Sequence, residues 1–198
     1  MSYRIDAIRD KFYNLKWYEV YDFIEFCLNE FSISHKEEFV EDLNKIFEEE
    51  NIGCRIIDNL VVPIIGEEEI KEIETAQKIS DRYSGAKIHL QKALELYAKR
   101  PQPDYKNSIK ESVSAIEALA RIITNNPSAT LGDLTKQLSI HPAFREGLNK
   151  IYGWTSDEGG IRHSQKDYQY QYLESGEDEA RFILVLAHAF VNYIIKKT

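Results

Sequence analysis

The sequence has few cysteines and no apolar run long enough for a membrane span. Its two cysteines, Cys27 and Cys54, fit neither a disulfide framework nor a metal cluster. The longest apolar stretch, 183–195, falls short of the ~20 residues that a membrane helix needs, and it contains His188 and Asn192. The first ten residues carry charges that interrupt any signal-peptide pattern. These absences predict a cytoplasmic protein with no membrane contact.

Motifs for metals and cofactors are also missing. The histidines are scattered and form no His-x-x-x-His pair: His35, His89, His141, His163 and His188. There is no phosphate-binding loop, no dinucleotide fingerprint and no Gly-x-Ser-x-Gly nucleophile turn. We therefore expect no metal and no cofactor.

The charge balance is acidic. With 29% charged residues and a net charge of −8, the chain does not attract nucleic acid or anionic lipid over its whole surface, although a local basic site is compatible with this value. Much of the acid lies in two triplets, 48–50 and 67–69, which we interpret as solvated helix ends.

Hydrophobic periodicity predicts a mainly α protein. Apolar residues recur at three- and four-residue spacings over most of the chain, for example at Ile109, Val113 and Ile116. The period changes only near residues 54–64, where two short strands around Asp58-Asn59 predict one small β-hairpin.

Two further features organise the second half of the chain. The prolines in 100–104 predict a linker. The last helix, 177–196, is apolar on almost every side, which is typical of a helix buried in a bundle or at a subunit interface.

The segment 153–164 is the best candidate site, because polar, glycine and titratable residues interrupt the helical pattern there. A neutral His163 can remove a proton from a ribose hydroxyl, and Arg162 can stabilise the charge on the adjacent phosphate. With Ser156 and Asp157 nearby, this set suits metal-independent RNA cleavage. The alternative is structural: Arg162 pairs with Asp157 or Glu158, and His163 caps a turn.

Glu117 is a supporting candidate. Ser114, Glu117 and Arg121 share one face of a predicted helix, where Glu117 and Arg121 have the spacing of an ordinary surface ion pair. If that face turns toward the 153–164 segment, Glu117 orients His163 or Arg162 instead. Both interpretations are open.

Several segments resemble the HEPN-like (higher eukaryotes and prokaryotes nucleotide-binding) part of AbiJ-type bacterial abortive-infection proteins. The resemblance is most specific in five stretches: 104–117, 129–133, 141–144, 148–153 and 155–163. The amino-terminal helices and the hairpin are more loosely similar to the accessory region that precedes the HEPN-like part in that family. This resemblance implies two regions, an amino-terminal helical region with the hairpin at 1–81 and a HEPN-like four-helix bundle at 82–198.

The resemblance also implies a site at the interface of a homodimer, acting on RNA in phage defence without a metal. His163 matches the histidine of the family motif. The usual position of the arginine holds Ser156, followed by Asp157, while Arg162 lies directly beside the histidine.

Three functions follow from these residues. The first is a dimeric endoribonuclease with His163 as base or acid and Arg162 as the phosphate-stabilising cation. The second is a non-catalytic HEPN-like module that binds RNA, a nucleotide or a regulatory protein partner. The third is a scaffold protein.

Overall fold

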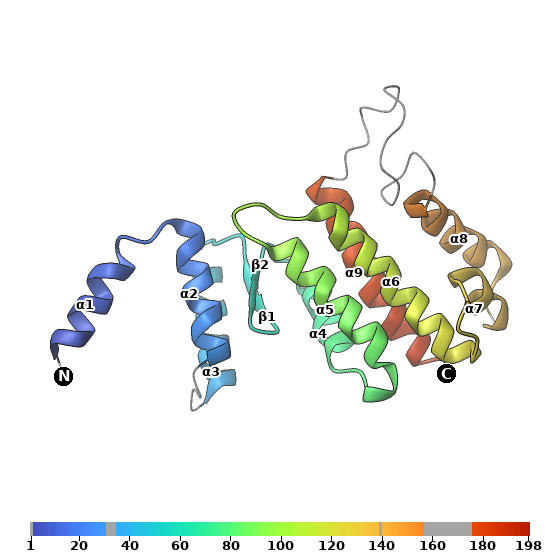
Figure 1. The fold of residues 1–198 in the computed structure, drawn as a ribbon, viewed down its shortest axis with the longest axis horizontal. Coiled ribbons are helices and arrows are strands. Elements are labelled where there is room, and N and C mark those ends of the chain that lie inside the picture. Colours follow the sequence, from blue (N-terminus) through green and yellow to red (C-terminus); the bar gives the residue numbers. More distant parts are fainter. Residues whose placement is uncertain (1, 31–34, 139, 157–175) are drawn as a thin grey trace, which may run out of the picture. The chain divides into compact units, whose positions relative to one another are not determined.

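The chain is mainly helical, with a single two-stranded hairpin in the part that the structure describes (Figure 1). The computed structural model describes residues 2–30, 35–138, 140–156 and 176–198. In chain order the elements are α1 (Ser2–Phe12), α2 (Trp17–Glu30), α3 (Lys36–Glu49), β1 (Arg55–Ile57), β2 (Leu60–Val62), α4 (Glu67–Gln77), the short 3₁₀ helix η1 (Asp81–Tyr83), α5 (Ser84–Ala98), α6 (Tyr105–Thr124), α7 (Leu131–Gln137), α8 (Pro142–Ser156) and α9 (Glu177–Ile195). The mainly α class with one small hairpin is confirmed.

The chain forms two compact units, described here one at a time. Unit 1 comprises residues 1–65 together with 100–102, and unit 2 comprises residues 66–99 and 103–198. The core of unit 1 lies between α2, α3 and the hairpin, where Leu28, Phe47, Ile56 and Val61 are buried.

The hairpin forms because its turn residues tolerate a left-handed backbone. Asp58 and Asn59 have φ values of 49° and 65°, as a two-residue hairpin turn requires. The strands pair antiparallel, with Ile56 opposite Val61. The Asn44 side chain of α3 fixes the hairpin in place: it accepts from the backbone N–H of Ile56 at 2.7 Å and donates to its carbonyl oxygen at 3.2 Å.

Arg100 completes unit 1 from the loop between α5 and α6. Its side chain is only 9% exposed, and Nη2 lies 2.6 Å from Glu25 and 3.1 Å from Asp22. Nη1 donates to the carbonyl oxygen of Val61 at 2.7 Å, and the guanidinium lies over the ring of Tyr21. The predicted linker at 100–104 therefore carries a buried cation that ties α2 to β2.

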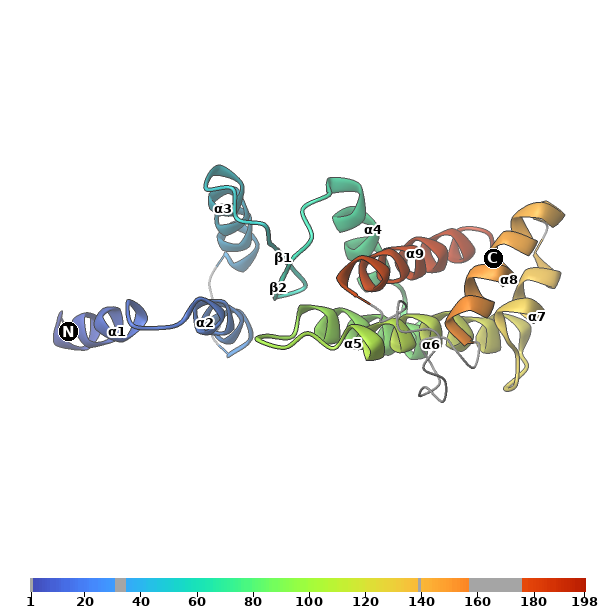
Figure 2. The ribbon, with the colours of Figure 1, turned by 90° about the horizontal axis from the view of Figure 1, so that it is seen from above.

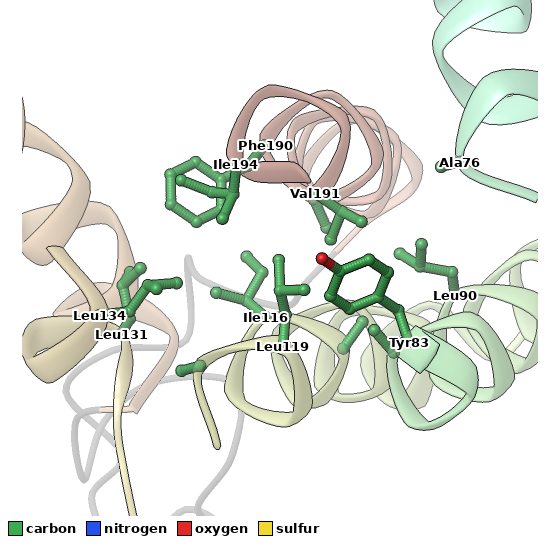
Figure 3. Close-up of a cluster of buried hydrophobic side chains, with 14 of the residues drawn as sticks. Ala76, Tyr83, Leu90, Ile116, Leu119, Leu131, Leu134, Phe190, Val191 and Ile194 are labelled. Carbon is green, nitrogen blue, oxygen red and sulfur yellow. The ribbon is translucent and has the colours of Figure 1, made fainter. Parts of the chain in front are cut away.

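Unit 2 is a helical bundle in which α9 packs along α6 and against α4 (Figures 1 and 2). Apolar side chains of α9 face those of α6 and α7 (Figure 3). The members labelled there are Ala76, Tyr83, Leu90, Ile116, Leu119, Leu131, Leu134, Phe190, Val191 and Ile194. The expectation that the last helix is buried is met along most of its length, although Phe182 remains exposed.

Two polar contacts join α4 to α9. Arg181 of α9 forms a two-point ion pair with Glu69 of α4, with Nε 3.0 Å from Oε1. Asn192 donates to the backbone carbonyl of Glu72 at 2.9 Å and to its carboxylate at 2.6 Å. These contacts lie within unit 2, to which α4 belongs.

The end of α8 differs from the sequence expectation. The loop was expected to begin at residue 153, but Gly153 to Ser156 continue the helix. The buried Thr155 donates its hydroxyl to the carbonyl oxygen of Tyr152 at 2.8 Å, which satisfies both groups within the helix. No helix in the described residues is long and apolar enough to cross a membrane.

Candidate functional site

The predicted centre of the site lies outside the described residues. This applies to His163, Arg162 and Asp157, whose segment joins α8 to α9. Ser156 is the last residue of α8, and only its backbone is described. The structure thus describes one of the five predicted site residues in full, Glu117.

Glu117 lies on α6, and its carboxylate faces α8. Its side chain is 14% exposed, and one of its oxygens accepts a hydrogen bond from the Tyr152 hydroxyl. Tyr152 lies one helical turn before Ser156, so Glu117 contacts the end of α8 from which the segment with Arg162 and His163 departs.

The second oxygen of Glu117 lies 3.5 Å from Nη2 of Arg121, one turn along α6. The ion pair expected from spacing is therefore present, and it coexists with the contact to α8. Ser114 is not part of this group, because its hydroxyl donates to the carbonyl oxygen of Lys110 at 2.9 Å. A half-exposed pair such as Glu117–Arg121 stabilises a helix by only about 0.5 kcal/mol.

Tyr152 is the site-proximal residue that sequence reasoning missed. The signal available in the sequence was its position four residues before Ser156, which places both on one side of a helix. This spacing is informative only if α8 continues to Ser156. Because the helix was expected to stop earlier, Tyr152 had no predicted relation to Glu117.

A small apolar cavity of about 30 Å³ lies beside the same end of α8. It is lined mainly by aliphatic and aromatic side chains, among them Val113, Ile116, Ile183, Ala187 and Phe190, with Tyr152 and Thr155 at the α8 side. Pockets that hold drug-sized ligands or cofactors measure about 300–1,000 Å³. This cavity therefore has room for a water-sized group, not for a nucleotide.

His188 is buried in the centre of α9 and acts as a core residue. Its Nδ1 lies 2.7 Å from the carbonyl oxygen of Leu184, one turn earlier. Burial lowers the pKa of His188 to about 4, against smaller opposing effects from that carbonyl and from the Glu72 carboxylate. A neutral, enclosed imidazole takes no part in proton transfer at neutral pH, which agrees with a structural role for His188 and Asn192.

His89 forms a contact with Glu111 that the sequence did not suggest. Nδ1 of His89 on α5 lies 2.6 Å from Oε2 of Glu111 on α6, and both side chains are partly exposed. A carboxylate on one ring nitrogen fixes the tautomer and orientation of an imidazole. The same contact also joins α5 to α6, and a structural link of this kind is sufficient to account for it.

Metal binding finds no support in the described segments. Among these residues no group of three or more His, Cys, Asp or Glu side chains is arranged to hold a metal ion.

Comparison with known proteins relates part of the chain to a family. No curated protein and no solved structure matches the chain. A HEPN-like bundle over 82–198 stays a prediction, as does the boundary after residue 81. The family match lies in the amino-terminal part, where the resemblance was expected to be looser: residues 2–78, from α1 through the hairpin to α4, match the family model described as AbiJ N-terminal domain 4.

Proposed function

We propose that this protein acts in bacterial abortive infection, as a phage-defence protein. The observation that carries this proposal is the match of residues 2–78 to AbiJ N-terminal domain 4. The residues that resemble the HEPN-like part of the same family follow it in the chain, in the order in which that family combines the two regions. A defence role therefore accounts for both halves of the sequence.

A phage challenge tests this role. Bacteria carrying the gene on an inducible plasmid are infected with a panel of phages beside an empty-plasmid control, and plaque numbers and phage released per cell are counted. We expect fewer plaques for at least one phage, with infected cells dying before phage release. Equal plaque numbers for every phage of a broad panel would contradict the defence role.

We propose further that the bundle is a metal-independent endoribonuclease that acts as a homodimer. His163 is the base or acid and Arg162 stabilises the phosphate charge, with Ser156 and Asp157 beside them. Glu117 supports this assignment, because through Tyr152 it contacts the end of α8 that leads to these residues. Glu117 would act on the site by holding that helix end in position.

The enzymatic proposal is tested on mixed RNA in the presence of a chelator. Wild-type protein is compared with His163→Ala and Arg162→Ala, and with His141→Ala as the control, since His141 directly precedes α8 and its ring accepts a hydrogen bond from the Ala143 backbone. We expect cleavage by the wild type and the control and none by the two site variants. A monomer by light scattering at micromolar concentration would contradict the dimer.

The alternative function is a non-catalytic module that binds RNA, a nucleotide or a regulatory protein. Ser156, at the usual position of the motif arginine, favours it. Nucleotide or RNA binding by a wild-type protein that cleaves nothing would support this alternative over the ribonuclease.

A further inference from the structure

Helix α3 of unit 1 has an apolar inner face and, beside it, two exposed apolar side chains. The inner face packs on the hairpin and α2 through Val40, Asn44 and the buried Phe47. Phe39 and Ile46 lie on another side of the helix and are 39% and 49% exposed.

The exposed residues form a continuous ridge along α3. Phe39, Leu43 and Ile46 follow one another at spacings of four and three residues, which places them in line on the helix surface. Phe39 and Ile46 are exposed, whereas Leu43 between them is half-buried because it also packs on the core of unit 1. This i, i+4, i+7 spacing is how amphipathic helices present their anchor residues to a partner. Large apolar side chains gathered in this way on a surface mark interaction sites more often than scattered ones do.

A row of charged residues runs beside this ridge. It consists of Glu38, Asp42, Lys45 and Glu49, all exposed, so three of its four members are acidic. The whole helix has six carboxylates and two lysines, for a net charge of −4. One of those lysines, Lys36, is directed to the carbonyl oxygen of Leu28 and away from this row.

The acid is concentrated in the unit that bears the ridge. Residues 1–65 contain fourteen Asp and Glu against seven Lys and Arg, so with Arg100 unit 1 has a net charge of −6. The total of −8 then leaves −2 for unit 2. The negative charge of unit 1 repels polyanions such as RNA and attracts basic partners.

We propose that the α3 ridge is a docking surface for a basic amphipathic helix of another protein. Apolar side chains of that helix pack on Phe39, Leu43 and Ile46, while its Lys or Arg residues pair with Glu38, Asp42 and Glu49. Charge complementarity selects this occupant. A second copy would bring one unit with a net charge of −6 against another, and a nucleic acid would add its own negative charge. The proposal does not depend on ribonuclease activity in the bundle.

Binding of designed peptides to the full chain tests the proposal. The probes are two synthetic amphipathic helices of about 18 residues, one of Leu and Lys and one of Leu and Glu, followed by fluorescence anisotropy. We expect the Leu/Lys peptide to bind, with an affinity that falls as salt is raised, and the Leu/Glu peptide not to bind. In Ile46→Ser the Kd for the Leu/Lys peptide should rise about tenfold or more, the loss typical of an interface anchor.

Control variants separate this surface from general attraction to an acidic protein. Ile88→Ser removes an apolar side chain of α5, beside Lys87, that is more exposed than Ile46, and it should leave the Kd unchanged. Asp42→Lys should weaken binding of the Leu/Lys peptide, while the thermal unfolding midpoint of this variant stays near that of the wild-type protein.

Three outcomes would overturn the proposal. The first is no binding of the Leu/Lys peptide. The second is an unchanged Kd in Ile46→Ser, which would mean that only general charge attraction is measured. The third is a wild type that self-associates by light scattering while Ile46→Ser is monomeric, which would assign the ridge to a second copy.

Discussion

Single residues in the core determine how the stability of this protein depends on pH. The imidazole of His188 is buried and has a pKa of about 4, whereas an unfolded histidine titrates near 6.5. Between these two pH values the unfolded chain binds more protons than the folded one. The neutral core histidine therefore leaves stability intact above about pH 6.5 and lowers it as the pH falls toward 4.

We expect the free energy of unfolding of unit 2 to fall by about 2 kcal/mol between pH 7.5 and pH 5 because of His188. Urea titrations at both pH values measure this difference. In His188→Leu the pH dependence should largely vanish, whatever the variant does to absolute stability. His35→Gln, a change at an exposed histidine, should keep it.

The two carboxylates whose pKa values are lowered do not interfere with this measurement. Hydrogen bonds to the Asn107 side chain and to the Thr130 backbone lower the pKa values of Asp104 and Asp133 below their usual 3.8. Their contribution is present above that value and lost only as the pH falls below it. An unchanged pH slope in His188→Leu would therefore show that His188 is not the titrating group.

Among elements, local signals make some boundaries predictable, and tertiary contacts decide others. The hairpin was predictable because Asp58 and Asn59 tolerate positive φ, and the start of α6 because Asp104 caps it through the Asn107 backbone. The end of α8 was not predictable from composition. Gly153 suggests a break, but the packing of Thr155 in the core continues the helix past it.

The candidate site shows the same limit. Sequence spacing alone placed Glu117 beside Arg121 on one face of the helix, and this ion pair is present. The contact between Glu117 and Tyr152 joins residues 35 positions apart, and it depends on how α8 packs on α6. A helical period fixes which residues share a face, but it contains nothing about which other helix that face meets.

The two acidic triplets lie at opposite ends of their helices and should therefore act in opposite directions. Glu48 and Glu49 end α3, where the helix dipole is negative, and Glu67 to Glu69 begin α4, where it is positive. We expect Glu48→Gln to stabilise unit 1 and Glu68→Gln to destabilise unit 2, each by about 0.5 kcal/mol at low salt. Both side chains are exposed, so packing changes little.

The two tryptophans allow each unit to be followed separately. Trp17 lies on α2 of unit 1 and Trp154 on α8 of unit 2. In variants that retain one tryptophan, with the other replaced by Phe, urea unfolding reports one unit at a time. The shifts expected for Glu48→Gln and Glu68→Gln should shrink in high salt. A shift of the same sign in both would show that the dipole is not the cause.

The loop between α5 and α6 links the stability of unit 1 to a distant part of the chain. Arg100→Met removes the cation that pairs with Glu25 and Asp22 and leaves Glu25 partly buried beside the Val61 N–H. Loss of one partner of a buried ion pair costs about 3 kcal/mol or more. We expect the free energy of unfolding to fall by about this amount in the transition that Trp17 reports, and to change little in the transition that Trp154 reports.

A matched variant tests the geometry of this contact. Arg100→Lys keeps the charge but cannot donate to Val61, Glu25 and Asp22 at once, because an ammonium lacks the planar fork of a guanidinium. The stability of unit 1 in Arg100→Lys should therefore lie between that of the wild type and that of Arg100→Met. Arg145→Met, which removes a partly exposed arginine from α8 of unit 2, serves as the control. Equal stability of all four proteins in the Trp17 transition would rule out a structural role for Arg100.

At the scale of the whole molecule, the chain passes between the two units at residues 65/66, 99/100 and 102/103. A contiguous amino-terminal segment therefore does not contain all of unit 1. A fragment of residues 1–78 would include the stretch matched by the family model, but it would lack Arg100. It would also contain α4 without α9, the helix on which α4 packs. Truncation there exposes Ile73 and Ala76, which are fully buried in the intact chain.

We therefore expect a fragment of residues 1–78 to unfold without the cooperative Trp17 transition of the full chain. Circular dichroism and Trp17 fluorescence in urea measure this directly. The full chain with Arg100→Met separates the two causes, because it loses the Arg100 contacts but keeps α4 packed on α9. That variant should unfold cooperatively at a lower urea concentration than the wild type, whereas the fragment should show no cooperative transition. The difference between the variant and the fragment then reflects the exposed face of α4 and the missing loop backbone. A fragment that unfolds cooperatively at the midpoint of the full chain would instead show that residues 1–65 need neither the loop nor the bundle.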